Sequence, residues 1–147
     1  MKPEHSKVPV PRAPVLPPLA HEGADCRGVA SILARVGDKW SVFVIMLLGN
    51  GPRRFNEIKR TVGGISQRML TLTLRGLERD GLVTRTVFPT IPPRVDYELT
   101  RVGRTLLEPV MALAAWAEKN RGQIQAARDR FAKVSERKRK VGERATG

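Results

Sequence analysis

Apolar residues recur every three or four positions near the start of the folded part of this 147-residue chain. They are Val29, Ile32, Leu33 and Val36. This spacing predicts an amphipathic helix over residues 26–36 that ends at Gly37. The next stretch, 39–48, is apolar nearly all round, and Asp38 is placed to cap it. A helix without a polar face belongs at the centre of a small domain.

A glycine pair, Gly63-Gly64, separates two further predicted helices. The shorter begins at about Phe55, and the longer is capped by Ser66 and reaches about Asp80. Two helices joined by a short glycine turn are typical of a helix-turn-helix unit.

Beyond Gly81 the period changes, because β-forming residues stand on both sides of a proline-rich tip at 89–93. These residues are Val83, Val87, Val95, Tyr97 and Leu99. The pattern predicts a β-hairpin, and Thr100 is then placed to cap a final long helix. The expected fold class is mainly α (α+β), a winged helix-turn-helix domain with a two-stranded wing and a long C-terminal dimerisation helix.

The two ends of the chain differ in composition from its middle. Six of the 11 prolines lie in residues 1–22, which we expect to be a disordered tail. The winged-helix domain is assigned to residues 23–122. Residues 123–147 are expected to form the end of the last helix and a basic tail that includes the run Arg137-Lys138-Arg139-Lys140.

The net charge of +13 and the pI of about 11.2 favour a polyanionic partner. Residues 23–130 hold 18 of the 27 Lys and Arg and 10 of the 14 Asp and Glu, so a net +8 belongs to the folded part. No apolar run approaches the roughly 20 residues that span a bilayer. The N-terminal stretch also lacks the continuous apolar segment of a signal peptide. We therefore expect a cytoplasmic protein with no membrane partner.

Residues that carry catalytic or metal chemistry are few. Cys26 is the single Cys, and the two His residues, His5 and His21, both lie in the N-terminal stretch. No pair of carboxylates with an evident shared site and no glycine-rich phosphate loop is present. The sequence therefore predicts no enzyme activity, no cofactor and no metal site.

The predicted helix over 66–80 has two different faces. Its apolar face is formed by Leu70, Leu74 and Leu77. The opposite face and the first turn carry Ser66, Gln67, Arg68, Thr71, Leu72, Arg75 and Arg79. In the major groove, Arg bonds guanine, Gln bonds adenine, and Leu or a Thr methyl contacts thymine. We favour DNA reading over a merely solvated face, because Glu78 is the only acid within residues 66–79 and lies off the arginine side.

Two more arginine pairs are candidates for DNA contact. Arg85 and Arg94 are expected to alternate with core-facing residues on the two strands and to contact phosphates or the minor groove. Arg53-Arg54, ahead of the third helix, is a candidate phosphate clamp, and a solubility role is almost equally weighted. The prolines at the hairpin tip restrict the loop before binding, which lowers its ordering cost on DNA.

The last predicted helix carries a heptad seam, with steps that alternate between four and three. The seam positions are Leu106, Val110, Leu113, Ala117, Asn120, Ile124, Ala127 and Phe131. This stripe is too long for the small domain to cover, so we expect a second copy to cover it, with Asn120 fixing the register. The alternative is one amphipathic helix that packs on its own domain.

Several sequence motifs stand in one register over roughly residues 26–118. They are GDKW at 37–40, GPRRFNEI at 51–58, GISQRMLT at 64–71, LERDGLV at 77–83 and PPRVDYELT at 92–100. Together they closely resemble the HxlR-type winged-helix transcriptional regulators. The resemblance implies a bacterial or archaeal homodimer that binds a palindromic operator in double-stranded DNA. It also implies dimerisation through the first and last helices.

The resemblance bears on Cys26 as well. Members of the family often carry a Cys just before the first helix, and some use it to sense oxidants or electrophiles. The family usually has Pro after this Cys, whereas Arg27 follows here. Arg27, Arg35 and the helix N-terminus would favour the thiolate of a redox or electrophile sensor. The favoured alternative is a small residue kept for packing.

Two functions follow from these patterns. The first is a dimeric, sequence-specific DNA-binding transcriptional regulator, which we expect to be a repressor. The second is a non-specific nucleic-acid-binding protein, nucleoid- or RNA-associated, whose affinity is set by salt. A small-molecule or electrophile effector is compatible with the first function, although the sequence supplies no chemistry for a small-molecule pocket.

Overall fold

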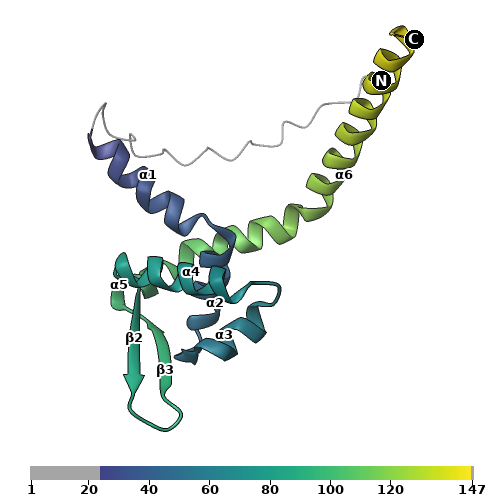
Figure 1. Cartoon of the computed structure of the whole chain (residues 1–147). Coiled ribbons are helices and arrows are strands. Elements are labelled where there is room, and N and C mark those ends of the chain that lie inside the picture. Colours follow the sequence, from purple (N-terminus) through teal and green to yellow (C-terminus); the bar gives the residue numbers. More distant parts are fainter. Residues whose placement is uncertain (1–23, 147) are drawn as a thin grey trace, which may run out of the picture.

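The computed structural model describes residues 24–146, with side chains from Arg27 onward. Its elements are α1 (Ala24–Val36), α2 (Lys39–Leu48), β1 (Arg53–Arg54), α3 (Phe55–Val62), α4 (Gln67–Arg79), β2 (Val83–Phe88), β3 (Arg94–Leu99), α5 (Arg101–Thr105) and α6 (Leu107–Ala145). Figure 1 shows a small body, from which α1 and the distal part of α6 extend. The proline-rich stretch 1–22 lies outside the described residues.

Two helices begin at the caps that the sequence predicts. The Asp38 carboxylate accepts a hydrogen bond from the backbone N of Ser41 at 3.2 Å. The Ser66 hydroxyl accepts one from the backbone N of Met69 at 3.0 Å. Each cap satisfies an N–H group that has no partner within the first turn of its helix, and so fixes where α2 and α4 start.

The core is built around α2, as its apolar composition predicts. The side chains without solvent exposure include Val44, Ile45 and Leu48 from α2, Ile58 from α3, and Leu70 and Leu77 from α4. Burial of each of these side chains is worth about 1.5–3 kcal/mol. The leucine face of α4 is therefore held inward, which turns the opposite face of the same helix outward.

The sheet has three antiparallel strands rather than the two expected, in the order β1-β3-β2. The additional strand is β1, in which Arg53 lies opposite Tyr97 and Arg54 lies opposite Asp96. A strand of two residues shows no alternation of polar and apolar positions, so the sequence pattern gives no sign of it. It attaches the start of α3 to the wing.

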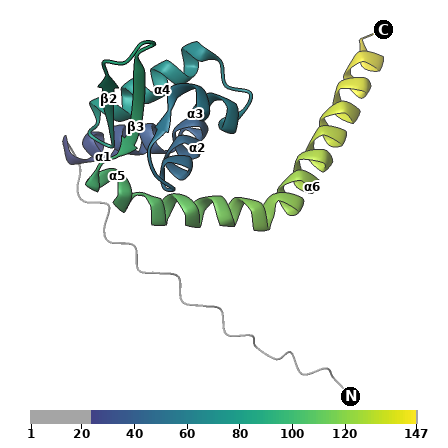
Figure 2. The same ribbon diagram turned by 90° about the horizontal axis from the view of Figure 1, so that it is seen from below.

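The predicted long final helix is divided in two. Thr100 caps α5, where its Oγ1 accepts a hydrogen bond from the backbone N of Gly103 at 3.1 Å, but α5 ends at Thr105. Pro109 then falls in the first turn of α6. A backbone N–H in the first turn has no acceptor within the helix, so a proline, which lacks this N–H, is tolerated there. Residues 123–147 are expected to form a helix end and a basic tail, but the helix α6 continues to Ala145, and residues 132–145 of it are exposed. Figure 2 shows that α6 bends and that its distal part stands clear of the body.

None of the helices within residues 24–146 combines the length and the apolar character that a bilayer crossing requires.

Candidate nucleic-acid interface

The turn between α3 and α4 depends on two consecutive glycines. Gly63 and Gly64 have φ angles of 66° and 70°, a backbone region that residues with a side chain rarely adopt. Ile65 follows them and is buried, and Ser66 then caps α4. The turn thus sets the angle between the two helices and leaves the first turn of α4 at the surface.

The outward face of α4 carries the residues expected to read bases. Its exposed residues are Ser66, Gln67, Arg68, Thr71, Leu72, Arg75 and Arg79. Leu72 is 52% exposed, whereas Leu74 on the inward side is 1% exposed. Within residues 24–146, neither Arg68 nor Arg75 takes part in an ion pair. Both guanidinium groups are therefore available to a ligand.

Two residues of this face also have contacts within the protein. The Thr71 hydroxyl donates to the backbone O of Gln67 at 2.9 Å, so its methyl group and its oxygen lone pairs are left for a ligand. Arg79 Nε lies 3.9 Å from Asp80 Oδ1, yet its side chain is 76% exposed. Arg79 can therefore contact a ligand while it stays near Asp80.

The two wing arginines lie on opposite faces of the sheet. Arg85 lies opposite Tyr97, which is buried, so Arg85 shares the face of the core residues. The expectation that both arginines alternate with core-facing residues is therefore wrong for Arg85. Side chains at positions 83, 85 and 87 point the same way because the strand period is two. Arg85 is nevertheless exposed, because the strand extends past the core.

A hollow of about 160 Å³ lies between α4 and the wing. It is lined by Thr71, Arg75, Glu78, Arg85 and Tyr97. The fold thus brings Arg75 of the candidate reading helix and Arg85 of the wing to one surface. Two cations and one acid leave this surface with a net positive charge, which suits a phosphate backbone.

Arg94 is engaged within the wing and is not the free phosphate contact that we expected. Its Nε and Nη2 each donate to one carboxylate oxygen of Asp96 at 3.1 Å. Its guanidinium group also lies 4.4 Å from the centroid of the Phe88 ring. The sequence places Arg94 and Asp96 two residues apart on one strand face, which is the signal that predicts such a pair.

The expected clamp of Arg53 and Arg54 is split between the two faces of β1. Arg53 is half-buried on the face of Tyr97, and Arg54 is exposed on the other face. Arg54 lines a second hollow, of about 890 Å³, between α3, β1 and the wing. The fold therefore leaves one arginine of the pair, rather than both, at this surface.

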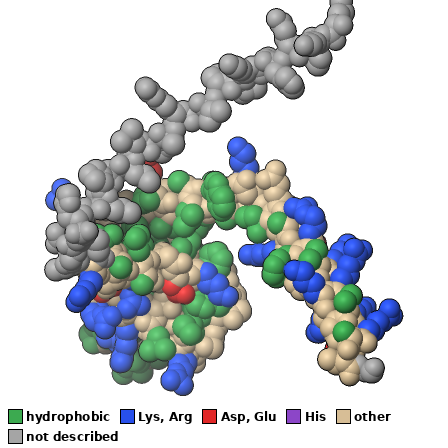
Figure 3. Space-filling model, turned by 90° about the horizontal axis from the view of Figure 1, so that it is seen from above, with side chains coloured by type: hydrophobic (Ala, Val, Ile, Leu, Met, Phe, Trp, Pro, Cys, Tyr) green, Lys and Arg blue, Asp and Glu red, His purple; other side chains and the backbone are tan. Residues whose placement is uncertain are grey.

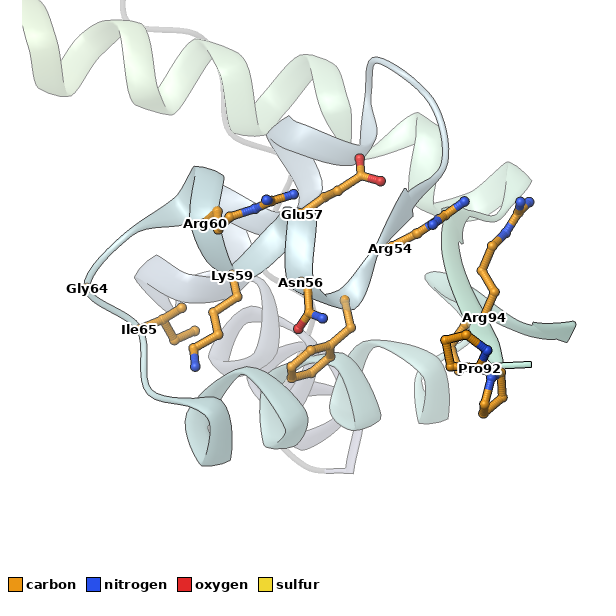
Figure 4. A pocket seen from close by; sticks show the side chains of 12 residues that line it. Arg54, Asn56, Glu57, Lys59, Arg60, Gly64, Ile65, Pro92 and Arg94 are labelled. Carbon is orange, nitrogen blue, oxygen red and sulfur yellow. The ribbon is translucent and has the colours of Figure 1, made fainter. Parts of the chain in front are cut away.

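Figure 4 shows four cations around this second hollow, Arg54, Lys59, Arg60 and Arg94. Glu57 is the one acid among the residues that line it. Lys59 and Arg60 are not among the interface residues that the sequence motifs predict. The signal that finds them is the charge of residues 53–60, four cations against one acid, on the helix that precedes the reading helix.

Cys26 lies in the first turn of α1, and its side chain is outside the described part of the chain. Arg35 lies nine residues further along α1, about 14 Å at the helical rise. Its guanidinium group pairs with Asp80, at the C-terminal end of α4. The sensor and packing interpretations of Cys26 stay predictions.

The predicted dimer seam begins inside the chain's own domain. Leu106 packs against the core and Val110 is buried, so the domain itself covers the first two seam positions. From Leu113 onward the seam positions are exposed or half-exposed, Ala117, Asn120 and Ile124 included. Figure 3 shows Lys and Arg side chains gathered on the distal part of this helix. The Asn120 amide donates to the backbone O of Trp116 at 2.8 Å, within its own helix.

Within residues 24–146, His, Cys, Asp and Glu form no group of three or more that could hold a metal ion.

Comparison with known proteins connects this geometry to a family. A model of HxlR-like helix-turn-helix proteins matches residues 35–125. The chain belongs to the HxlR-like helix-turn-helix family. The uncharacterized HTH-type transcriptional regulator YtfH of Escherichia coli is 40% identical over 98 residues, which are 67% of this chain and 78% of the relative. YybR of Bacillus subtilis, also an uncharacterized HTH-type transcriptional regulator, is 44% identical over 93 residues, 63% of this chain and 74% of YybR.

Solved structures support the assignment of this chain to the HxlR-like family. A ytfH protein from Salmonella typhimurium superposes with a TM-score of 0.65 at 38% identity, over 69% of this chain and 90% of that one. The redox regulator HypR in its reduced form gives a TM-score of 0.62 at 42% identity, over 67% and 98%. The predicted winged-helix fold is confirmed, and the HxlR-like chain is a DNA-binding transcriptional regulator of the helix-turn-helix type.

Proposed function

We propose that this chain is a homodimeric, sequence-specific regulator that reads a palindromic operator with α4 and acts as a repressor. In this mechanism α4 enters the major groove by its N-terminal end, so that Gln67 and Arg68 reach deepest. Arg75, further along the same face, reaches a base edge, and Arg85 of the wing follows the adjacent backbone. Occupancy of the operator would then exclude RNA polymerase.

The observation that carries this proposal is the outward face of α4. It joins hydrogen-bond donors with apolar contacts for thymine methyl groups. Glu78, the one acid of α4, does not lie away from the arginines as the sequence predicts, because it lines the same hollow as Arg75 and Arg85. Donors and apolar groups together on one exposed helix face are what base reading in the major groove requires. The Ser66 cap and the Gly63-Gly64 turn hold this face in one orientation.

Homodimerisation is supported by apolar side chains that stay exposed in the described part of the chain. On α1, Val29, Ile32 and Leu33 are 48%, 62% and 59% exposed, although they form one helical stripe. On α6, Leu113 and Trp116 are 54% and 57% exposed. Exposed apolar stripes of this kind mark an interaction site, and a second copy with the same two stripes would cover them.

The alternative function, non-specific binding of nucleic acid, is favoured by one observation. Residues 126–145 of α6 are exposed and carry eight Lys and Arg against three Asp and Glu. Such a surface binds any polyanion, with an affinity that falls steeply with salt.

A binding-site selection separates the two functions. The full chain is incubated with a pool of random-sequence duplexes at physiological salt, and the recovered sequences are tested against a random duplex. A regulator should recover an inverted repeat and bind it at least about 10³-fold more tightly than random duplex. Recovery of no common sequence, or equal affinity for both duplexes, would contradict the proposal.

Repression is tested by transcription in vitro from a promoter that carries the recovered repeat. The expected result is a fall in transcript as the protein is added, with no change from a promoter whose repeat is scrambled. A rise in transcript would show activation instead.

A further inference from the structure

The tip of the wing is apolar and carries no charge. No Asp, Glu, Lys or Arg occurs from Thr86 to Pro93. Ile91, at the end of the hairpin, is 102% exposed. Isolated exposed aliphatic residues are common on proteins, so exposure alone does not indicate a function for Ile91.

The backbone around Ile91 is held by several constraints. Thr90 donates from its backbone N to the Phe88 carbonyl at 2.8 Å, and from its hydroxyl to the Pro92 carbonyl at 2.9 Å. Three of the residues in 89–93 are prolines, whose φ angles are fixed by the ring. The tip thus presents Ile91 in a restricted shape, and little conformational entropy is lost when it docks.

Charged and aromatic side chains lie on the two strands next to the tip. Arg94 stacks on Phe88 and pairs in a bidentate way with Asp96, so its charge is balanced inside the wing. Arg85 lies three residues before Phe88, about 10 Å further from the tip along the strand. No cation in the hairpin is therefore placed to lead the tip into a groove, and the leading side chain is Ile91.

We propose that Ile91 enters the minor groove of duplex DNA beside the half-site read by α4, as an apolar wedge at one base step. The inference rests on the proposed function. Apolar side chains that enter from the minor groove partly unstack a base step and kink the duplex. The hairpin projects from the body with its tip unobstructed (Figure 1), and it shares a hollow with α4 through Arg85 and Arg75.

Two consequences distinguish a wedge from a phosphate contact. A wedge adds affinity that does not depend on salt, because it releases no counterions. It also favours flexible pyrimidine–purine steps at the insertion point, because these steps unstack most easily. The wing of this chain would then read deformability, while α4 reads base edges.

The test uses the full chain and a duplex recovered by the selection described above. 2-Aminopurine replaces adenine at successive positions flanking each half-site, and its fluorescence rises where stacking is lost. The wild type should raise the fluorescence severalfold at one step on each flank. Ile91→Ala should abolish this rise and weaken binding roughly tenfold, with an unchanged salt slope. Val102→Ala, which shortens another exposed aliphatic residue, is the matched control and should change neither quantity.

Three outcomes would overturn the wedge. One is an absence of increased fluorescence at every flanking position with the wild type. Another is wild-type affinity and fluorescence in Ile91→Ala. The third is a fall of the salt slope by about one in Arg94→Ala, because a cation would then be the contacting group. If the selection itself yields no preferred sequence, the proposed function fails and the wedge fails with it. Failure of Ile91 alone leaves the reading by α4 intact.

Discussion

Arg35 in the last turn of α1 and Asp80 at the C-terminal cap of α4 form an ion pair, with Nε 3.0 Å from Oδ2. The two side chains are 27% and 37% exposed, so the pair is partly shielded from solvent. The guanidinium group also lies against Gly76, where any Cβ would overlap it. The pair therefore joins the helix that begins near Cys26 to the C-terminal end of the reading helix.

We expect a measurable coupling energy for this pair. A double-mutant cycle with Arg35→Ala and Asp80→Ala should give about 0.5–1 kcal/mol in the free energy of unfolding by urea, falling at high salt. The matched control is Arg104–Glu98, at 3.4 Å with side chains 50% and 48% exposed, which should couple less. Coupling of Arg35–Asp80 no larger than that of the control would show that the contact does not join the helices energetically.

Two leucines of α4 should separate stability from binding. Leu74→Ala removes a core side chain and should lower the free energy of unfolding by about 2–5 kcal/mol. Leu72→Ala makes the same substitution on the outward face and should change stability by less than about 0.5 kcal/mol. Urea unfolding of both variants checks the stabilities, and titration of the selected duplex should show weaker binding for Leu72→Ala. Equal stability losses would contradict the assignment of the two faces.

Glycines at a turn and within a helix should respond in opposite directions to the same substitution. Gly64→Ala places a side chain at a φ of 70° and should destabilise the protein by about 1–2 kcal/mol. Gly122→Ala lies within α6, where an added Cβ meets nothing within 4 Å, and should stabilise the helix by about 0.5–1 kcal/mol. Circular dichroism during thermal unfolding measures both changes. If Gly64→Ala is as stable as the wild type, the left-handed backbone of the turn is not what orients α4.

The proposed dimer predicts that a charge on the α1 stripe separates the subunits. Ile32→Glu should sediment as a monomer at concentrations where the wild type is a dimer, because the carboxylate would be desolvated in the interface. Ile91→Glu makes the same substitution at the wing tip and should stay dimeric. If Ile32→Glu is as dimeric as the wild type, the exposed stripe of α1 is not the interface.

The regular elements of the body follow from local patterns in the sequence. The cap at Asp38, the cap at Ser66 and the all-apolar stretch of α2 each fix a helix through nearest neighbours or periodicity, and the structure confirms them. The inward and outward faces of α4 follow in the same way from a spacing of 100° per residue. These features need no knowledge of what lies elsewhere in the chain.

The features that the sequence could not supply depend on contacts between distant segments. β1 exists because Arg53 and Arg54 meet β3, more than 40 residues away. Arg35 meets Asp80 only after α1 has folded across α4, so a charge pattern within α1 could not assign its partner. The placement of Arg85 and Arg94, by contrast, could have been predicted from the sequence. A strict strand period of two puts Arg85 on the face of Val83 and puts Arg94 on the other face, beside Asp96.

Base reading by the outward face of α4 is tested most directly by the specificity of Arg75→Ala. Affinity for the selected duplex and for each single-base variant of it is measured at several salt concentrations, with Arg128→Ala on distal α6 as the control. A base contact predicts a loss of about 1–3 kcal/mol in Arg75→Ala together with relaxed preference at one base pair of each half-site. A preference profile identical to that of the wild type, with affinity reduced equally on every duplex or not at all, would contradict the claim that Arg75 reads a base.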